Sequence, residues 1–267
     1  MKHDFSRLEQ ELKIRGYSKK TNKAYLYHNQ QFLKFCKKSS LQINKQDVKR
    51  YLEYLLDKDL ARATVRLICN ALKFYYSQVL RRNLFQEIKL PKKDQKTVLP
   101  LTKEEILHLI DVTKNPKHKL LIELLYGSGL RVGEVVKLKF KDLFLQERLL
   151  LVRKGKGRKD RKVILSERAL KNLSSFDFNE GYIFPGRGGH ITIRTVQAIF
   201  EQVARKANLS KNVHPHMLRH SFASHLKDNK VETKDIQKLL GHSNKRTTER
   251  YLHRIDMDMK KIKSPLD

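Results

Sequence analysis

The chain has 267 residues, and its 58 Lys and Arg residues exceed its 28 Asp and Glu residues to give a formal net charge of +30. Such a surplus repels itself unless a polyanion neutralises it, so we expect nucleic acid as the partner, with an anionic membrane surface as the second choice. No run of about 18 apolar residues occurs and the first residues lack the apolar core of a signal peptide, which argues against membrane-spanning and secreted classes and favours a cytoplasmic protein.

The first ninety or so residues contain a series of amphipathic segments. The clearest is 61–80, where apolar residues recur at helical spacing: Val65, Ile68, Cys69, Leu72, Tyr76 and Val79. Weaker patterns of the same kind cover three earlier segments, 5–15, 18–37 and 45–57. The sequence therefore predicts a compact four-helix domain over residues 1–89.

The segment LPKKDQKTVLP, residues 90–100, breaks this periodicity with prolines and lysines. Such a composition is typical of an extended, exposed connection. We therefore expect a linker here, followed by a second domain over residues 101–267.

The second domain is expected to be rich in α-helix with a small β element. The TKEE pattern at 102–105 resembles a capping box and begins a helix. Two short β-type runs, 149–152 and 162–165, flank a glycine-rich basic tip and predict a hairpin or small sheet. Further helices are expected at 196–207, 215–228, 233–240 and 246–253. The predicted fold class is thus mainly α, in two domains, with a small β-sheet or hairpin in the second.

The two cysteines, Cys36 and Cys69, lie among apolar helical positions. Neither belongs to a CxxC pair or a Cys/His cluster with the spacing of a zinc site. We interpret both as core thiols and expect no disulfide.

A group of polar residues in VHPHMLRHS indicates chemistry on phosphate. His216, Arg219 and His220 are spaced so that a helix would carry them on one face. A solvated polar face explains this spacing as well, whereas a zinc site explains it less well because the HExxH glutamate and a third ligand are missing. A guanidinium offers paired donors to phosphate oxygens, and an imidazole can move protons near neutral pH.

Three other stretches could contribute cations to the same phosphate. Arg131 in GSGLRVGE stands at an expected helix start, Lys156 in GKGRK at the hairpin tip, and His242 in LGHS after a glycine. Each also has a plain explanation, namely a salt bridge, a surface lysine and a helix C-cap. Because the chain has no Walker loop and no clustered carboxylates for Mg²⁺, we expect no metal and no cofactor. Phosphoryl transfer would then need a protein nucleophile, and a tyrosine phenol qualifies.

Four motifs, GLRVGE, GKGRKDR, HMLRHSFASHL and LLGHSNKRTTERYLH, in this order and at similar intervals, resemble the tyrosine recombinase (phage integrase) family, and most of all its Xer branch. The resemblance covers nearly the whole chain. It implies that residues 1–89 form a DNA-binding, or core-binding, domain and that residues 101–267 form the catalytic domain. His214 departs from the family's pattern, since relatives usually carry a small hydroxyl residue before the Pro-His pair.

The resemblance also implies roles for the residues around the phosphate. Arg131 and Arg219 would hold the non-bridging oxygens of the scissile phosphate, and His216 would assist proton transfer. Glu134 would orient an arginine and would not itself react.

Tyr251 would be the nucleophile that forms a 3′-phosphotyrosyl intermediate. Lys156 would protonate the departing 5′ oxygen, and His242 would bond the phosphate from the opposite side. Tyr126 lies in an apolar run and Tyr182 precedes IFP, so we interpret both competing tyrosines as structural.

The implied activity is site-specific recombination of double-stranded DNA at short inverted-repeat, dif-like sites, independent of metal and ATP. We expect a nucleoid-associated homo-oligomer that is a tetramer on synapsed DNA and a dimer or monomer when free, with no membrane partner. Its expected role is Xer-type resolution of chromosome or plasmid dimers, in chromosome partition and cell division. The alternatives are integration or transposition of a mobile element, a type IB topoisomerase activity, and a non-enzymatic architectural DNA-binding protein.

Overall fold

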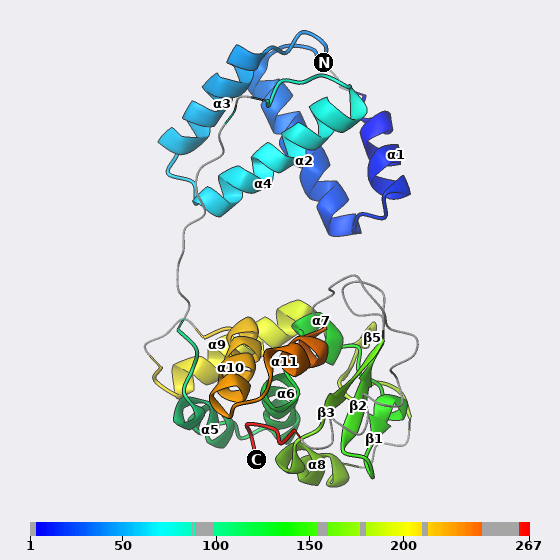
Figure 1. Ribbon diagram of the computed structural model, residues 1–267, viewed down its shortest axis with the longest axis vertical. Helices are drawn as coiled ribbons and strands as arrows, with labels where there is room; N and C mark the ends of the chain where they lie inside the picture. Colours follow the sequence, from blue (N-terminus) through cyan, green and yellow to red (C-terminus); the bar gives the residue numbers. More distant parts are fainter. Residues whose placement is uncertain are drawn as a thin grey trace. The chain divides into compact units, whose positions relative to one another are not determined.

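The computed structural model describes residues 4–86, 88, 99–153, 160–176, 180–209, 213–241 and 262–267. The chain divides into two compact units, Met1–Thr97 and Val98–Asp267 (Figure 1). Each unit has its own hydrophobic core. Within the described residues no helix is both long and apolar enough to cross a membrane. The part of the expected linker at 90–98 and the expected helix at 246–253 lie outside the described residues, and the exact domain limits stay a prediction.

The first unit contains the four helices that the sequence predicts. They are α1 (Ser6–Ile14), α2 (Lys19–Cys36), α3 (Lys45–Asp57) and α4 (Arg62–Lys73). The expected helix over 61–80 is wrong in one respect, because after Lys73 the backbone continues as a π-helical segment, Phe74–Val79. The wider π turn changes the angle between successive side chains, and the three consecutive aromatic residues at its start are all buried. Cys36 and Cys69 are free thiols, and Cys69 is fully buried.

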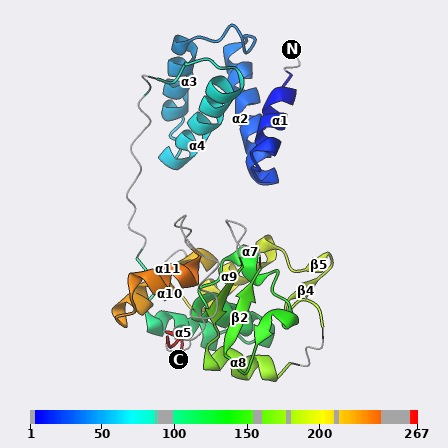
Figure 2. The same ribbon diagram turned by 45° about the vertical axis from the view of Figure 1, so that its right-hand side comes forward.

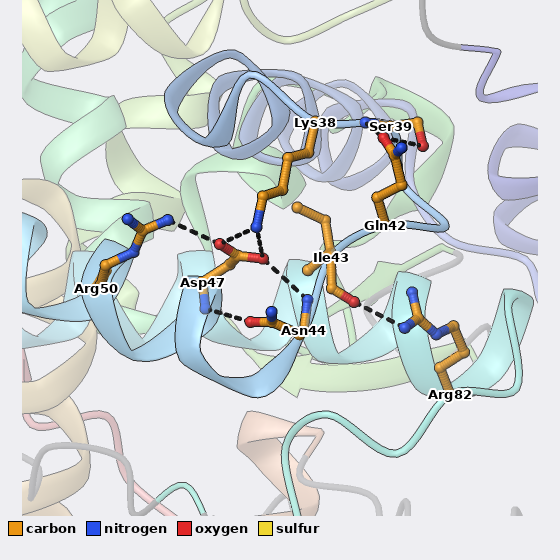
Figure 3. A network of polar contacts seen from close by, with 8 residues as sticks. All are labelled: Lys38, Ser39, Gln42, Ile43, Asn44, Asp47, Arg50 and Arg82. Carbon is orange, nitrogen blue, oxygen red and sulfur yellow. Dashed lines mark hydrogen bonds and ion pairs between the residues drawn. The ribbon is translucent and has the colours of Figure 1, made fainter.

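A polar network fixes the start of α3 (Figure 3). Asn44 and Asp47 form a reciprocal capping box, in which each side chain accepts a hydrogen bond from the other residue's backbone N–H at 3.0 Å. Lys38 Nζ donates to both oxygens of the buried Asp47 carboxylate at 2.9 Å, and Arg50 donates to one of them at 2.8 Å. Arg82 adds hydrogen bonds to the carbonyl groups of the loop that precedes α3. Side chains from the loop after α2, from α3 with its cap, and from the segment after Val79 therefore hold one helix terminus.

The second unit is built around α6 (Pro116–Gly127), which contacts the helices α5 (Lys103–Asp111), α7 (Val132–Val135), α8 (Glu167–Ser174) and α10 (Pro215–Asp228). Every residue of α6 from Leu120 to Gly127 is buried, so the second half of this helix has no solvent-facing side and no amphipathic stripe. The helices α9 (Ile193–Lys206) and α11 (Thr233–Leu240), with a short 3-10 helix at Phe140–Asp142, complete the helical set in the described part of the unit.

The predicted β element is an antiparallel sheet with strands in the order β1 (Leu143–Phe144), β2 (Leu149–Val152) and β3 (Arg161–Ile164). Leu150 of β2 pairs with Val163 of β3. A separate two-stranded ribbon, β4 (Pro185–Gly186) and β5 (Gly189–His190), follows α8. Helix α11 contacts both α10 and β3, and Figure 1 shows it between them. Figure 2 gives a second view of the same elements. The start of β3 meets the end of α11, because Arg161 donates a hydrogen bond to the carbonyl of Leu239.

Gly129 permits a tight approach between the turn after α6 and helix α10. Its φ is +59°, and an added Cβ would lie 2.4 Å from the ring of Phe222. We expect Gly129→Ala to lower the free energy of unfolding by about 2–4 kcal/mol, because left-handed backbone strain adds to overpacking. Urea denaturation followed by circular dichroism measures this change. Gly188→Ala is the matched control, since nothing lies within 4 Å of a Cβ there, and an equal loss in both variants would contradict the steric argument.

Candidate active site

Glu134 is the centre of a buried ionic group at the start of α7. Its Oε2 accepts the backbone N–H of Arg131 at 2.8 Å, and its Oε1 accepts Nη1 of the same residue, also at 2.8 Å. Arg131 has the extended backbone of a helix N-cap and follows the left-handed turn at Gly129. Its side chain keeps 25% of its surface exposed, whereas that of Glu134 keeps 7%. Glu134 thus holds Arg131 in place while leaving part of the guanidinium open to a ligand.

Arg161, the first residue of β3, makes the second contact with Glu134. Its Nη1 and Nη2 donate to the two carboxylate oxygens at 2.9 and 2.8 Å, a bidentate ion pair. Its Nε donates to the carbonyl of Leu239 in α11 at 2.8 Å. One guanidinium therefore joins three elements, namely β3, α7 and α11.

Arg219 on α10 is the third cation of the group and is only 4% exposed. Its Nη1 donates to the carbonyl of Gly129 at 2.6 Å, and its Nη2 donates to the carbonyl of Leu240. Nη1 also lies 3.9 Å from Oε2 of Glu134. We call Arg131, Arg161 and Arg219 the arginine cluster.

The arginine cluster carries three positive charges against the single negative charge of Glu134. Burial alone would raise the pKa of Glu134, but the hydrogen bonds from Arg161 and Arg131 and the charge of Arg161 outweigh it and lower that pKa to about 2. Burial, and next the charge of Arg131, lower the pKa of Arg219 to about 9, so its guanidinium stays charged at neutral pH. The remaining positive charge favours an anion that presents several oxygens, such as a phosphate.

His216 lies one helical turn before Arg219 on α10 and is exposed. Partial burial and the neighbouring charges, first that of Arg219, lower its pKa below the ordinary value, so the imidazole is neutral at pH 7 and can accept a proton. His220 is also exposed, whereas Arg219 turns inward. The three residues of the predicted helical face therefore differ in environment, with two at the surface and one in the ionic group.

We expect added inorganic phosphate to raise the pKa of His216, because an anion on the arginine cluster offsets the charges that now lower it. An NMR titration of the imidazole signals, with and without phosphate at constant ionic strength, measures this pKa. His118 on α6 is the internal control, since burial is the cause of its lowered pKa. A shift of equal size at both histidines, or none at His216, would contradict anion binding by the arginine cluster.

Three expected site residues, Lys156, His242 and Tyr251, lie outside the described residues. Described residues close to two of them in the chain belong to the arginine cluster or contact it, namely Arg161, Leu239 and Leu240. Lys156 stands in the sequence between β2 and β3, and β3 begins at Arg161. His242 directly follows Gly241, the left-handed cap of α11, and the carbonyls just before that cap accept the hydrogen bonds of Arg161 and Arg219.

The competing tyrosines have structural surroundings. Tyr126 is fully buried, its hydroxyl lies 2.7 Å from Nδ1 of His225, and burial raises its pKa. The ring of Tyr182 packs against His190 and beneath the Lys139 ammonium. In the described part of the chain, no group of three His, Cys, Asp or Glu side chains is placed to hold a metal ion.

Sequence reasoning did not single out Arg161, although it stands in the quoted motif GKGRKDR. Its partner Glu134 lies 27 residues earlier in the chain and Leu239 lies 78 residues later. No local spacing reveals such contacts. The only signal in the sequence was an arginine at the end of the basic tip, directly before the strand predicted at 162–165, and the observed β3 begins one residue earlier at Arg161.

Family models match both units of the chain. Residues 100–257 match the phage integrase family, and residues 5–86 match the phage integrase N-terminal SAM-like domain. The chain belongs to the phage integrase family. It is a tyrosine recombinase of the Xer-like type, that is, a site-specific DNA recombinase.

Relatives agree with this family over most of the chain. A tyrosine recombinase XerC of Lacticaseibacillus casei is 33% identical, over 90% of this chain and 89% of the relative. A crystal structure of XerA recombinase superimposes with a TM-score of 0.52 at 28% identity, covering 95% of this chain and 96% of that one. A lambda integrase from a tetramer bound to a Holliday junction shares the fold with a TM-score of 0.74 at 20% identity, over 92% of this chain and 78% of that chain. The predicted fold class, mainly α with a small sheet, is confirmed by these matches and by the described elements.

Proposed function

We propose that this recombinase cuts and rejoins double-stranded DNA through a 3′-phosphotyrosyl intermediate on Tyr251. The observation that carries the proposal is the arginine cluster, in which three guanidiniums face one carboxylate and leave a net positive charge for the scissile phosphate. Fixed cations at that point stabilise the negative charge that develops on the phosphate oxygens during attack. Arg131 and Arg219 bind these oxygens, and Glu134 orients Arg131.

In the first step the Tyr251 oxygen forms a bond to phosphorus and the bond from phosphorus to the 5′ oxygen breaks. The neutral His216 imidazole assists in removing the phenolic proton, and Lys156 gives a proton to the departing 5′ oxygen. His242 bonds the phosphate from the side opposite the arginines. The phosphate ester conserves the energy of the original bond, so the 5′-hydroxyl of a partner strand can displace Tyr251 without ATP. The reaction as proposed draws on no metal and no cofactor.

We further propose that residues 1–89 bind the DNA core site and that residues 101–267, after the linker at 90–100, carry out catalysis. The formal net charge of +30 supports contacts between the protein and DNA phosphates. We therefore expect the affinity for DNA to fall steeply as the salt concentration rises. By analogy with the lambda integrase tetramer on a Holliday junction, the active assembly is a homo-tetramer that forms from free monomers or dimers on two synapsed sites. The protein acts in the cytoplasm at the nucleoid.

The proposed biological role is Xer-type resolution of chromosome or plasmid dimers at inverted-repeat, dif-like sites. It is supported by a relative named XerC that matches nine tenths of the chain. Integration of a mobile element uses the same chemistry on a different pair of sites and is the second candidate, since a similar protein of Sinorhizobium fredii is named a putative integrase/recombinase.

A supercoiled plasmid with two directly repeated candidate sites tests this function in buffer without Mg²⁺ and ATP. We expect two smaller circles from the two-site plasmid and no change in a plasmid without sites. Relaxation of the plasmid without sites would instead show a type IB topoisomerase. Tight, salt-sensitive binding with neither product would favour an architectural DNA-binding protein.

A further inference from the structure

Arg161 differs from Arg131, the more open of the two arginines proposed to bind phosphate, in how its guanidinium is used. Its three nitrogens all donate to protein oxygens, two to Glu134 and one to Leu239. Its side chain is 11% exposed, compared with 25% for Arg131. The fork of Arg161 is thus directed at the protein itself, at one carboxylate and one backbone carbonyl.

The guanidinium of Arg161 contacts two groups that have different roles, the Glu134 carboxylate and the Leu239 carbonyl. At one end Arg161 holds both oxygens of Glu134, and Glu134 in turn holds the side chain and backbone N–H of Arg131. At the other end Arg161 holds the carbonyl of Leu239, next to the carbonyl of Leu240 that accepts Arg219. The last turn of α11 and the phosphate-binding arginines therefore belong to one hydrogen-bonded unit. The chain runs from that turn directly into His242 and on to Tyr251.

We propose that Arg161 is a positioning residue that sets the phosphate-binding arginines in register with the segment that carries the nucleophile. This inference rests on the proposed function of Tyr251. A planar fork reaches three acceptors in two directions at once, whereas a lysine ammonium on a flexible stem does not reproduce that geometry. Loss of the fork leaves the net charge near the phosphate positive and disturbs the alignment of the reacting groups.

The test compares Arg161→Ala and Arg161→Lys with wild type on short duplexes that trap the covalent adduct. Misplacement of about 1 Å costs on the order of 100-fold in rate. We therefore expect adduct formation about 100-fold slower in Arg161→Ala and at least about 10-fold slower in Arg161→Lys. DNA affinity should stay within about 3-fold, because many phosphate contacts share the binding energy.

A second substrate separates the role of Arg161 from that of Lys156, the proposed proton donor. When sulfur replaces the 5′ bridging oxygen, the thiolate leaves without needing a proton. Lys156→Ala should then recover its rate, and both Arg161 variants should stay slow. Recovery of the Arg161 variants on the sulfur substrate would show that they act only through Lys156 and would overturn the proposal.

Arg168→Ala is the matched structural control. Arg168 also binds a buried carboxylate, Glu123, and joins different elements, but it contacts no member of the arginine cluster in the described structure. It should lose thermal stability and keep the adduct rate of the folded protein. The positioning role would be contradicted if Arg161→Lys formed the adduct at the wild-type rate. It would also be contradicted if, at equal folded fraction, the adduct rate fell no more in Arg161→Ala than in Arg168→Ala. No adduct from wild type would instead count against the proposed function itself.

Discussion

Replacing Tyr251 with phenylalanine should abolish the covalent protein–DNA adduct, with a loss of at least about 1000-fold in its rate of formation. The phenylalanine ring keeps the shape of the side chain and removes only the oxygen that attacks phosphorus. Binding of the duplex should therefore remain within about 3-fold of wild type, because phosphate contacts by lysines and arginines supply most of the affinity. Denaturing gel electrophoresis of nicked substrates measures the adduct, and a mobility-shift titration measures binding.

The surroundings of the other tyrosines make matched controls available. The Tyr126 hydroxyl is buried against His225 and burial raises its pKa, so it is a poor nucleophile. Tyr182 packs its ring against His190. Tyr182→Phe should keep the wild-type adduct rate, and Tyr126→Phe should keep it in the folded fraction. Adduct formation that survives in Tyr251→Phe and disappears in either control would move the nucleophile to that tyrosine.

Replacing Glu134 with alanine should give the largest loss of stability, about 3–5 kcal/mol in the free energy of unfolding, because removing one partner of a buried ion pair leaves the other charges uncompensated. Arg161 and Arg219 are both nearly buried, and they would then face each other and Arg131 without a counter-charge. Urea denaturation at pH 7 measures the loss. Sulfate should restore part of it in Glu134→Ala, since a divalent anion can replace the missing carboxylate.

The pH dependence of stability offers an independent check on Glu134. Its pKa in the folded protein is about 2 and its ordinary value is 4.5, so the folded state binds the proton more weakly than the unfolded chain does. The stabilisation is therefore fully present above pH 4.5 and is lost as the pH falls towards 2. This difference corresponds to about 3 kcal/mol by linkage, in the range expected for the alanine variant.

The exposed Glu201 on α9 supplies the control for Glu134. Glu201→Ala should change the free energy of unfolding by no more than about 0.5 kcal/mol. A loss below about 1 kcal/mol in Glu134→Ala, or the same acid dependence in wild type and Glu134→Ala, would mean that Glu134 does not hold the arginine cluster together.

The sequence predicted the elements whose residues show a regular pattern. Three of the amphipathic helices of the first unit lie where their apolar spacing placed them, and β2 matches the run at 149–152. The helix α6 was not predicted as an element because its second half is buried on every side and shows no period. The π segment after Lys73 was missed for another reason. Tyr76 and Val79 continue the α-helical spacing of the apolar residues before them, so no break in the pattern marks the wider turn.

The site was predictable in part. Arg131 and Arg219 came from motif resemblance, and the structure brings them together around Glu134 although one caps α7 and the other lies on α10. The inward turn of Arg219, and the bidentate contact of Arg161 with Glu134, could not be inferred, because both depend on which helices and strands pack together. Local spacing fixes neighbours on one helix face, whereas contacts between β3, α7 and α11 arise only in the folded unit.

The most direct measurement is to trap the adduct of the wild-type protein on a nicked duplex, digest it with trypsin and identify the DNA-linked residue by mass spectrometry. The account predicts a phosphate that joins the Tyr251 oxygen to the 3′ end of the cut strand, together with a free 5′-hydroxyl that polynucleotide kinase can label. Linkage through another residue, a 5′-linked phosphate, or no adduct on any candidate site despite tight DNA binding would contradict it.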